Sequence, residues 1–381
     1  MSSVFVCPIC HNQEPLSIGI KNGVPYCRLC TTFNGKKIPY QKRHLQHFEY
    51  SLDYELSKEQ ETIADDLLLD YQKGRNALVY AVCGAGKTEL VLKTISYALK
   101  QSHNVAFVVP RKDVVIEMER RFKSIFKNNH VVAIYGGHSN ETIADILIMT
   151  NHQLYRYDHY FDLIIMDEID AFPFKNNALL KAFFQNALRG SYLLLSATPS
   201  EAIITYFKER NYPIHSLFTR FHKQPIPIPV FYKKIAVLQI IFAIRKLKMY
   251  ARTKRPCLVF VPTIELSKII YYLLNIFVKK GNYINSKVNK RYELIEALKT
   301  GNLNYLVTTS VLERGVTFAN IQLIILFSDN HIYDAATLIQ ISGRAGRKKD
   351  FPHGDISILA AKKEEHIVKA VATINGYNQH L

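Results

Sequence analysis

The feature that most constrains this 381-residue chain is the short glycine-containing segment Cys83–Thr88, which reads CGAGKT. An apolar run, Ala77–Val82, precedes it, and a helical pattern over Glu89–Lys100 follows it. Strand, tight loop and helix in this order form the context in which such a segment binds phosphate. Glycines let backbone N–H groups turn toward phosphate oxygens, and the helix N-terminus adds partial positive charge.

Each residue of this loop has an expected role. Lys87 is expected to reach the β- and γ-phosphates of a nucleotide, and the Thr88 hydroxyl to hold Mg²⁺. The backbone of Gly84, Ala85 and Gly86 is expected to surround the phosphates. An ordinary glycine-rich turn before a helix is the alternative, and the motifs further along the chain count against it.

The composition indicates a folded chain with a strongly basic balance, since 48% of the residues are hydrophobic and the formal net charge is +17. Such a charge favours an anionic polymer as partner, although a generally basic proteome is the alternative. No apolar run approaches the roughly 20 residues of a membrane span, so we expect no transmembrane segment. The N-terminus lacks the plan of a signal peptide, so we expect a cytoplasmic protein whose six cysteines are reduced or metal-bound.

Four of these cysteines form two pairs, Cys7 with Cys10 and Cys27 with Cys30, separated by sixteen residues. Two pairs with this spacing are typical of a four-thiolate zinc site, which is closed and structural rather than catalytic. His11 is a competing ligand, but two complete pairs leave it unneeded. Chance pairing of reduced core cysteines is the alternative. Because residues 1–45 carry six Lys and Arg against one acid, both nucleic-acid contact and a purely structural role remain open.

A helix start is predicted at Ser57, with Gln60 three residues later as the partner in a capping box. Gln60 also precedes the phosphate loop, where its side-chain amide could read the edge of an adenine ring. The two roles are compatible, and the sequence favours neither.

From residue 77 to about 215, apolar runs alternate with amphipathic helical patterns. This alternation predicts an α/β fold with a doubly wound parallel sheet, in which ligands lie at the carboxyl ends of the strands. The predicted strands are Ala77–Val82, Val105–Val109, Val131–Ile134, Ile146–Met149, Leu163–Met166 and Tyr192–Leu195.

Polar residues directly follow these predicted strands. Asp167 and Glu168 follow one of them, and such an acidic pair can hold Mg²⁺ and polarise an attacking water. Arg111 and Thr150 follow two others, at positions where a phosphodiester could be held. Taken singly, each of these residues could instead be a helix cap, an exposed acid or part of a turn.

A proline-rich stretch, Phe221–Val230, cannot be helical and predicts an extended linker. The alternation then resumes without a second phosphate loop. Two polar clusters occur there, Thr308–Thr317 and Gln340–Arg347. The second carries two arginines three residues apart, an arrangement that can stabilise charge during phosphoryl transfer. Its alternative is a basic helix C-terminus that interacts with its own dipole.

In combination, the motifs resemble those of superfamily 2 helicase-type motors over about residues 50–360. The motifs are Gln60, the GAGKT loop, Pro110-Arg111, Gly136-Gly137, Thr150, Asp167–Asp170 (DEID), Ser196–Thr198 (SAT), Phe260–Pro262, the Thr308–Thr317 block and Gln340–Arg347 (QISGRAGR). Within this superfamily, the chain is similar to the ComFA family. That similarity rests on the four-cysteine module ahead of the motor and on the segments Asn151–Arg156 (NHQLYR) and Leu312–Phe318 (LERGVTF).

The resemblance implies two RecA-like lobes that close on ATP, preceded by a small zinc-binding module. It divides the chain into the zinc module at 1–45, an ATP-binding first lobe at 46–218, a linker at 219–232 and a second lobe at 233–381.

The resemblance also implies roles for individual residues. Thr317 departs from the pattern, because many relatives carry there an acid that contacts ribose. At the nucleotide, Lys87 and Thr88 are implied to bind phosphate and Mg²⁺, with further contacts from Gln60, Gly84, Ala85, Gly86 and Gly315. Asp167 and Glu168 are implied to bind Mg²⁺ and activate water, Gln340 and Arg344 to contact the γ-phosphate, and Arg347 to act as the arginine finger. The implied contacts to the nucleic-acid backbone come from Arg111, Thr150 and Thr309.

The implied activity is ATP-driven translocation of single-stranded DNA into the cell during natural transformation, with ATP, Mg²⁺ and Zn²⁺ as cofactors. The implied partners are single-stranded DNA, ComFC, DprA and the ComEC membrane channel, and the implied location is the cytoplasm or the inner face of the cytoplasmic membrane. The alternatives are a replication-restart or repair helicase resembling PriA, an RNA helicase, and, from a different class, a non-catalytic DNA-binding scaffold.

Overall fold

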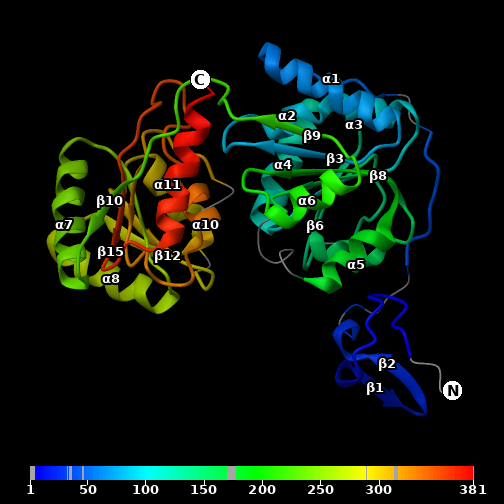
Figure 1. Ribbon diagram of the computed structural model, residues 1–381, viewed down its shortest axis with the longest axis horizontal. Helices are drawn as coiled ribbons and strands as arrows, with labels where there is room; N and C mark the ends of the chain where they lie inside the picture. Colours follow the sequence, from blue (N-terminus) through cyan, green and yellow to red (C-terminus); the bar gives the residue numbers. More distant parts are fainter. Residues whose placement is uncertain are drawn as a thin grey trace. The chain divides into compact units, whose positions relative to one another are not determined.

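The computed structural model describes residues 5–31, 33, 37–44, 47–138, 140–169, 177–288, 290–312 and 316–380. The chain divides into two compact units (Figure 1). The first comprises Met1–Ala81 and Gly86–Leu217, and the second comprises Val82–Ala85 and Phe218–Leu381. Among the described residues, no helix combines the length and the apolar character that a membrane crossing requires.

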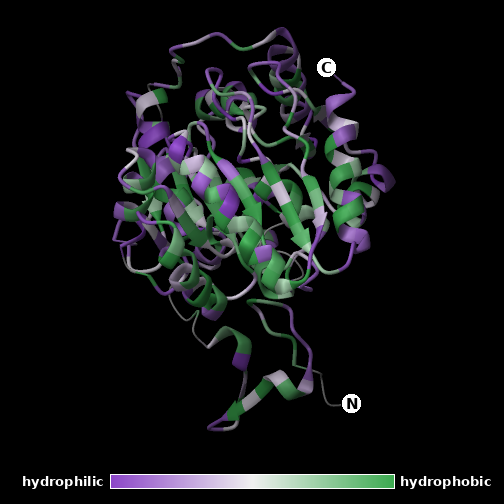
Figure 2. Cartoon of the chain, turned by 90° about the vertical axis from the view of Figure 1, so that its left-hand side faces the viewer, coloured by the Kyte–Doolittle hydropathy of each residue, from purple (hydrophilic) through white to green (hydrophobic). Residues whose placement is uncertain are grey.

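The first unit contains a seven-stranded sheet with the strand order β5-β6-β4-β7-β8-β3-β9. All of its strand pairs are parallel. Its central strands are buried on both faces, as the hydrophobic runs require. In Figure 2, where the left-hand side of Figure 1 faces the viewer, the visible strands are coloured largely as hydrophobic. The strands are β3 (Ala77–Ala81), β4 (Val105–Val109), β5 (Val131–Ile134), β6 (Ile146–Thr150), β7 (Phe161–Asp167), β8 (Leu188–Ser196) and β9 (Ile214–Leu217).

The helices of this unit connect its parallel strands. The predicted capping box is confirmed, since the Ser57 N–H donates to Gln60 Oε1 at 2.9 Å and the Gln60 N–H donates to Ser57 Oγ at 3.2 Å. The helical pattern predicted over Glu89–Lys100 is interrupted at Val91. The helices are α1 (Lys58–Gln72), α2 (Lys87–Leu90), α3 (Leu92–Lys100), α4 (Lys112–Ile125), the 3₁₀ helix η3 (Asn151–Arg156), α5 (Ala178–Ala187) and α6 (Glu201–Glu209).

The N-terminal module of the same unit is small. It consists of an antiparallel hairpin flanked by two 3₁₀ turns, and its buried residues are mainly cysteines. A segment this short depends on a metal or on its neighbours for stability. Its elements are η1 (Pro15–Ser17), β1 (Ile18–Lys21), β2 (Val24–Cys27) and η2 (Arg28–Cys30).

The second unit contains a six-stranded parallel sheet with the order β10-β15-β14-β11-β13-β12. Figure 1 shows α7 on one side of this sheet and α10 and α11 on the other. The elements are β10 (Val230–Lys233), α7 (Ala236–Arg252), β11 (Cys257–Phe260), α8 (Ile264–Phe277), β12 (Gly281–Ile284), α9 (Arg291–Lys299), β13 (Tyr305–Thr308), η4 (Ser310–Leu312), β14 (Gln322–Ile325), α10 (Ala335–Ser342), β15 (Ile356–Ala360) and α11 (Glu365–Asn378).

The predicted fold class, two parallel-sheet α/β lobes behind a small cysteine module, is therefore confirmed. Residues 218–229, which include most of the predicted linker, contain no helix or strand. Three residues of the Thr308–Thr317 block, 313–315, lie outside the described part of the chain, and so does Asp170.

Candidate functional site

The phosphate loop lies between β3 and α2, and its two glycines have the backbone conformation that the loop needs. Gly84 and Gly86 have φ angles of +87° and +83°, in the left-handed region that strains residues with a side chain. A Cβ atom at Gly86 would lie 2.5 Å from Gln60 Nε2. Lys87 Nζ donates to the Ala81 carbonyl at 3.2 Å, so the loop closes over its own strand.

Gln60 joins the first turn of α1 to this loop. Its Oε1 accepts from the Ser57 N–H, and its Nε2 lies beside Gly86. The buried side-chain amide is thereby held next to the loop, with its nitrogen near Gly86. A contact with adenine stays a prediction.

Glu89, a buried carboxylate beside the loop, was not identified as important from the sequence. Glu89, directly after Thr88, accepts a hydrogen bond from the Tyr54 hydroxyl at 2.5 Å and forms an ion pair with Arg121 of α4. Burial and this carboxylate raise the pKa of the Tyr54 hydroxyl. Glu89 thus ties the loop helix to α4. In the sequence it resembles an ordinary exposed acid in a first helical turn.

The acidic pair lies where β7 ends. Glu168 has a φ of +57°, a conformation uncommon for a residue with a side chain. Its N–H is held by Asp167 Oδ1 at 2.8 Å and by the Leu195 carbonyl at 3.0 Å. Backbone strain of this kind persists where the surrounding structure imposes it, and it occurs frequently at functional sites. Carboxylate oxygens at a strand end suit Mg²⁺.

Two of the predicted nucleic-acid contacts lie at the edge of the first sheet that is formed by the carboxyl ends of its strands. Thr150 is the last residue of β6 and pairs in register with Val109, the last residue of β4. Arg111 follows Val109 after one residue and occupies the N-cap position of α4 without a capping hydrogen bond from its side chain. Because β4 also pairs with β7, this edge is shared with the strand that ends at Asp167.

Three further residues at this edge were not singled out by the sequence. The rings of Tyr135 and His138 stack, with centroids 4.9 Å apart and planes inclined by 19°. Lys112 Nζ lies 4.7 Å from the centroid of the Tyr135 ring. Two backbone hydrogen bonds between Tyr135 and His138 close the turn around Gly136-Gly137. The exposed imidazole of His138 and the partly buried ring of Tyr135, beside Lys112, suit contacts to single-stranded nucleic acid.

In the second unit, the predicted arginines Arg344 and Arg347 both lie after the end of α10 at Ser342. Arg344 is 2% exposed and donates to the Val316 carbonyl, while Arg347 Nε donates to the Gly343 carbonyl at 2.9 Å. Thr309 is buried directly after β13. Gly315, a predicted nucleotide contact, lies outside the described residues.

The second unit includes the loop residues Val82–Ala85, and Gln340 contacts one of them. Cys83 Sγ donates to Gln340 Oε1 at 2.9 Å in a buried environment. A Cβ atom at Gly343 would lie 2.7 Å from Cys83 Cβ, so the absence of a side chain there permits this approach.

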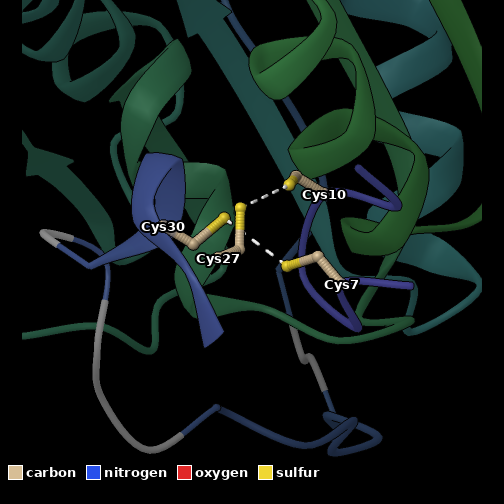
Figure 3. A group of neighbouring side chains, drawn as sticks. All are labelled: Cys7, Cys10, Cys27 and Cys30. Carbon is tan, nitrogen blue, oxygen red and sulfur yellow. Dashed lines mark hydrogen bonds between the residues drawn. The ribbon is translucent and has the colours of Figure 1, made fainter. Parts of the chain in front are cut away.

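The four predicted zinc ligands converge (Figure 3). The ligand atoms of Cys7, Cys10, Cys27 and Cys30 all lie within 4.8 Å of one another. The Sγ separations are 3.9 Å for Cys7 and Cys30 and 3.6 Å for Cys10 and Cys27. Four sulfurs at about 2.3 Å from a tetrahedral Zn²⁺ are about 3.8 Å apart, so the cluster fits this metal. His11 is engaged elsewhere, with Nε2 3.0 Å from Asn186 Oδ1.

The cysteine module packs on helix α5 of the first unit. Asn186 Nδ2 donates to the Ile9 carbonyl at 2.8 Å, and its Oδ1 contacts His11. Leu179 packs against the cysteine cluster. The module is therefore held by both polar and apolar contacts, although its own core is minimal.

Two family models match the chain. Residues 37–201 match the "Type III restriction enzyme, res subunit" model, and residues 234–349 match the "Helicase conserved C-terminal domain" model. The chain is also similar in structure to Dbp5 of S. cerevisiae bound to RNA and ADP BeF3, with a TM-score of 0.62, 16% identity and coverage of 86% of this chain and 92% of the other. At this identity, the likeness establishes the fold alone.

Two relatives match over most of their length. The chain is 31% identical to the competence protein ComFA of Bacillus subtilis, over 93% of this chain and 80% of that one. It is 30% identical to ComFA of Streptococcus pneumoniae, over 85% of this chain and 78% of that one. The two matches cover most of this chain and most of each relative, and the chain therefore belongs to the ComFA family, whose members are competence-related, ATP-hydrolysing helicases of superfamily 2.

Proposed function

We propose that this protein is an ATP-driven translocase that draws single-stranded DNA across the cytoplasmic membrane, from its inner side, during natural transformation. The observation that carries this proposal is the shared sheet edge at which Arg111 and Thr150 lie beside the strand of Asp167. Residues that could hold a DNA backbone and residues that could hold a nucleotide metal thus belong to neighbouring strands. The division into zinc module, two lobes and linker is part of the proposal.

The proposed ATP chemistry uses residues from both lobes on one nucleotide. Lys87 binds the β- and γ-phosphates, and Gln60 contacts the adenine. Glu168 positions and polarises the attacking water, which is consistent with its imposed backbone conformation. Mg²⁺, for which Thr88 and Asp167 would be ligands, supplies charge neutralisation on the phosphates. The second lobe contributes Gln340 and Arg344 at the γ-phosphate and Arg347 as the finger.

The proposed DNA contacts are to phosphate and sugar. Arg111 and Thr150 of the first lobe and Thr309 of the second form two sets of backbone contacts that alternate in affinity through the ATP cycle. Backbone contacts position the strand without reading its sequence. The binding is therefore expected to be sequence-independent and to weaken steeply with salt, because each phosphate contact releases counterions.

The proposed partners and location follow from family membership. We place the protein in the cytoplasm, peripheral to the inner face of the cytoplasmic membrane, in contact with ComFC, DprA and the ComEC channel. Zn²⁺ is the proposed occupant of the four-cysteine cluster, which its sulfur spacing supports.

The deciding experiment measures the ATPase rate with single-stranded DNA, duplex DNA and RNA at equal nucleotide concentration. Single-stranded DNA is expected to stimulate most, and translocation along it to require hydrolysis. Preferential stimulation by RNA would support an RNA helicase, and preference for forked duplexes a restart helicase. DNA binding with no stimulation by any nucleic acid would support a scaffold and contradict the proposal.

A further inference from the structure

Arg220 lies in the segment between β9 and β10, outside any helix or strand, yet its side chain is only 2% exposed. Its guanidinium group makes three hydrogen bonds to backbone carbonyls of one turn. Nη1 donates to Ala345 at 2.9 Å and to Gly346 at 2.7 Å, and Nη2 donates to Gly343 at 3.2 Å. A planar group with several donors in a fixed geometry is well suited to hold a turn in this way.

A second linker residue supports the same turn. His222 Nε2 lies 3.0 Å from the Gly346 carbonyl, and burial lowers the pKa of this imidazole. Gly346 has a φ of +67°, and a Cβ atom there would lie 2.2 Å from the Pro352 carbonyl oxygen. The turn is thus held tightly from both sides. It is the turn that carries Arg347, whose Nε donates to Gly343.

The charge of Arg220 has no carboxylate in contact with it among the described residues. Burial, together with the neighbouring charge of Arg347, lowers the pKa of Arg220 to about 10. Its Nε is buried and has no hydrogen-bond partner within the part of the chain that the structure describes. Burying a cation beside another cation is unfavourable unless an anion approaches.

The loop predicted to bind phosphate contributes Val82–Ala85 to the same compact unit as Arg220. A Cβ atom at Gly84 would lie 3.8 Å from Arg220 Nε and 3.9 Å from its Cγ. The side chain therefore passes beside the loop predicted to surround the nucleotide phosphates. Phosphate binding at that loop would supply the missing negative charge.

We propose that Arg220 is a positioning residue for the arginine finger: it holds the turn Gly343–Arg347 from the linker, so that Arg347 is presented to the nucleotide phosphates. This inference rests on the proposed role of Arg347. It assigns a function to the linker beyond connecting the lobes, because the linker is part of the apparatus that orients the catalytic arginine.

The test measures kcat and KM for ATP in the DNA-stimulated reaction of the full-length protein. Arg220→Ala is expected to lower kcat by about a hundredfold, because displacement of a catalytic group by about 1 Å has effects of this size. KM is expected to change little. Arg220→Lys keeps the charge but cannot hold three carbonyls, so it should also be slow. Full activity of Arg220→Lys would show that charge alone matters and would overturn the inference.

Two controls separate positioning from other causes. Lys223→Ala removes an exposed cation from the same linker and should leave kcat unchanged. The double variant Arg220→Ala with Arg347→Ala should be no slower than Arg347→Ala alone, because both changes remove one function. Multiplicative losses in the double variant would contradict the proposal.

Folding and the assignment of Arg347 are checked separately. If Arg220→Ala fails to fold, His222→Ala, which removes one hydrogen bond from the same turn, should show a smaller loss confined to kcat, and an unchanged kcat would overturn the inference. If Arg347→Ala retains normal activity, the proposed role of Arg347 fails. If Arg347→Ala is inactive while folded Arg220→Ala is normal, only the role of Arg220 fails.

Discussion

The ring of Phe33 stacks on the ring of His152, with centroids 6.2 Å apart and planes inclined by 11°. Phe33 also makes edge contacts with Tyr155 and Phe183, at 5.2 and 5.0 Å between centroids. Phe33 follows the last cysteine of the module by three residues. His152 lies in η3, a 3₁₀ helix that begins directly after Thr150. The cysteine module thus packs on the segment that follows a predicted DNA contact.

This packing predicts that the module supports DNA binding indirectly. Phe33→Ala is expected to weaken affinity for single-stranded DNA, because the edge and stacking contacts that order η3 are lost. Each aromatic pair contributes about 0.5–1.5 kcal/mol to the packing of the module on η3. Fluorescence anisotropy with a labelled oligonucleotide measures the change. Lys21→Ala, an exposed cation on the hairpin, is the matched control. A larger loss in Lys21→Ala than in Phe33→Ala would indicate that the module binds DNA directly.

Metal content gives a second prediction. The purified protein is expected to hold one zinc per chain, and Cys7→Ser or Cys30→Ser to lose it, because a structural site needs its four ligands. Elemental analysis measures this. Cys257→Ala, which changes a buried cysteine of the second sheet, should retain the zinc. Zinc retention in both ligand variants would refute the four-thiolate assignment.

The nucleotide site predicts two different kinds of inactive variant. Lys87→Ala should lose both ATP binding and hydrolysis, because the phosphates lose their cation. Glu168→Gln should bind ATP but hydrolyse it slower by about a hundredfold or more, because the water is no longer polarised. Equilibrium binding of a fluorescent ATP analogue and a phosphate-release assay separate the two. The control is Lys100→Ala, which removes an exposed lysine of α3 and should behave as the wild type. ATP hydrolysis by Lys87→Ala at the normal rate would remove Lys87 from the mechanism.

The Glu89 carboxylate predicts a stability effect. Glu89→Ala is expected to lower the free energy of unfolding by about 2 kcal/mol, because Tyr54 and Arg121 lose a shared buried acceptor. Tyr54→Phe removes one hydrogen bond and should cost about 1 kcal/mol. Urea unfolding measures both changes. Equal effects of the two substitutions would show that the ion pair with Arg121 adds nothing.

The exposed ring of His138 predicts a contact with a DNA base. His138→Ala is expected to weaken binding of single-stranded DNA by about 1 kcal/mol, the lower end of base stacking on a ring. An oligonucleotide with abasic sites should bind wild type and variant alike, since it has no base to stack. The control is His159→Ala, because His159 is exposed but lies before the start of β7, at the amino ends of the strands of the first sheet. A loss that persists with the abasic strand would indicate a phosphate contact instead.

Much of the fold could be predicted from local patterns. Runs such as Val105–Val109 are apolar at every position, and a strand buried on both faces requires this of its sequence. The short strands β9 and β12 were missed, because both are half polar and lack that pattern. The conformation of the phosphate loop could also be predicted, because the positive φ angles of Gly84 and Gly86 are available to glycine at little cost.

The sequence by itself determined which residues could hold phosphate, magnesium and zinc, because those chemistries depend on short spacings within one strand end, loop or pair of turns. Only the tertiary structure decided which distant residues support them. Arg220 and Ala345 are 125 positions apart, and no periodicity links a linker residue to the turn it holds. The same is true of Phe33 and His152. Such contacts arise when separate elements pack together, and packing depends on the whole chain rather than on any local pattern.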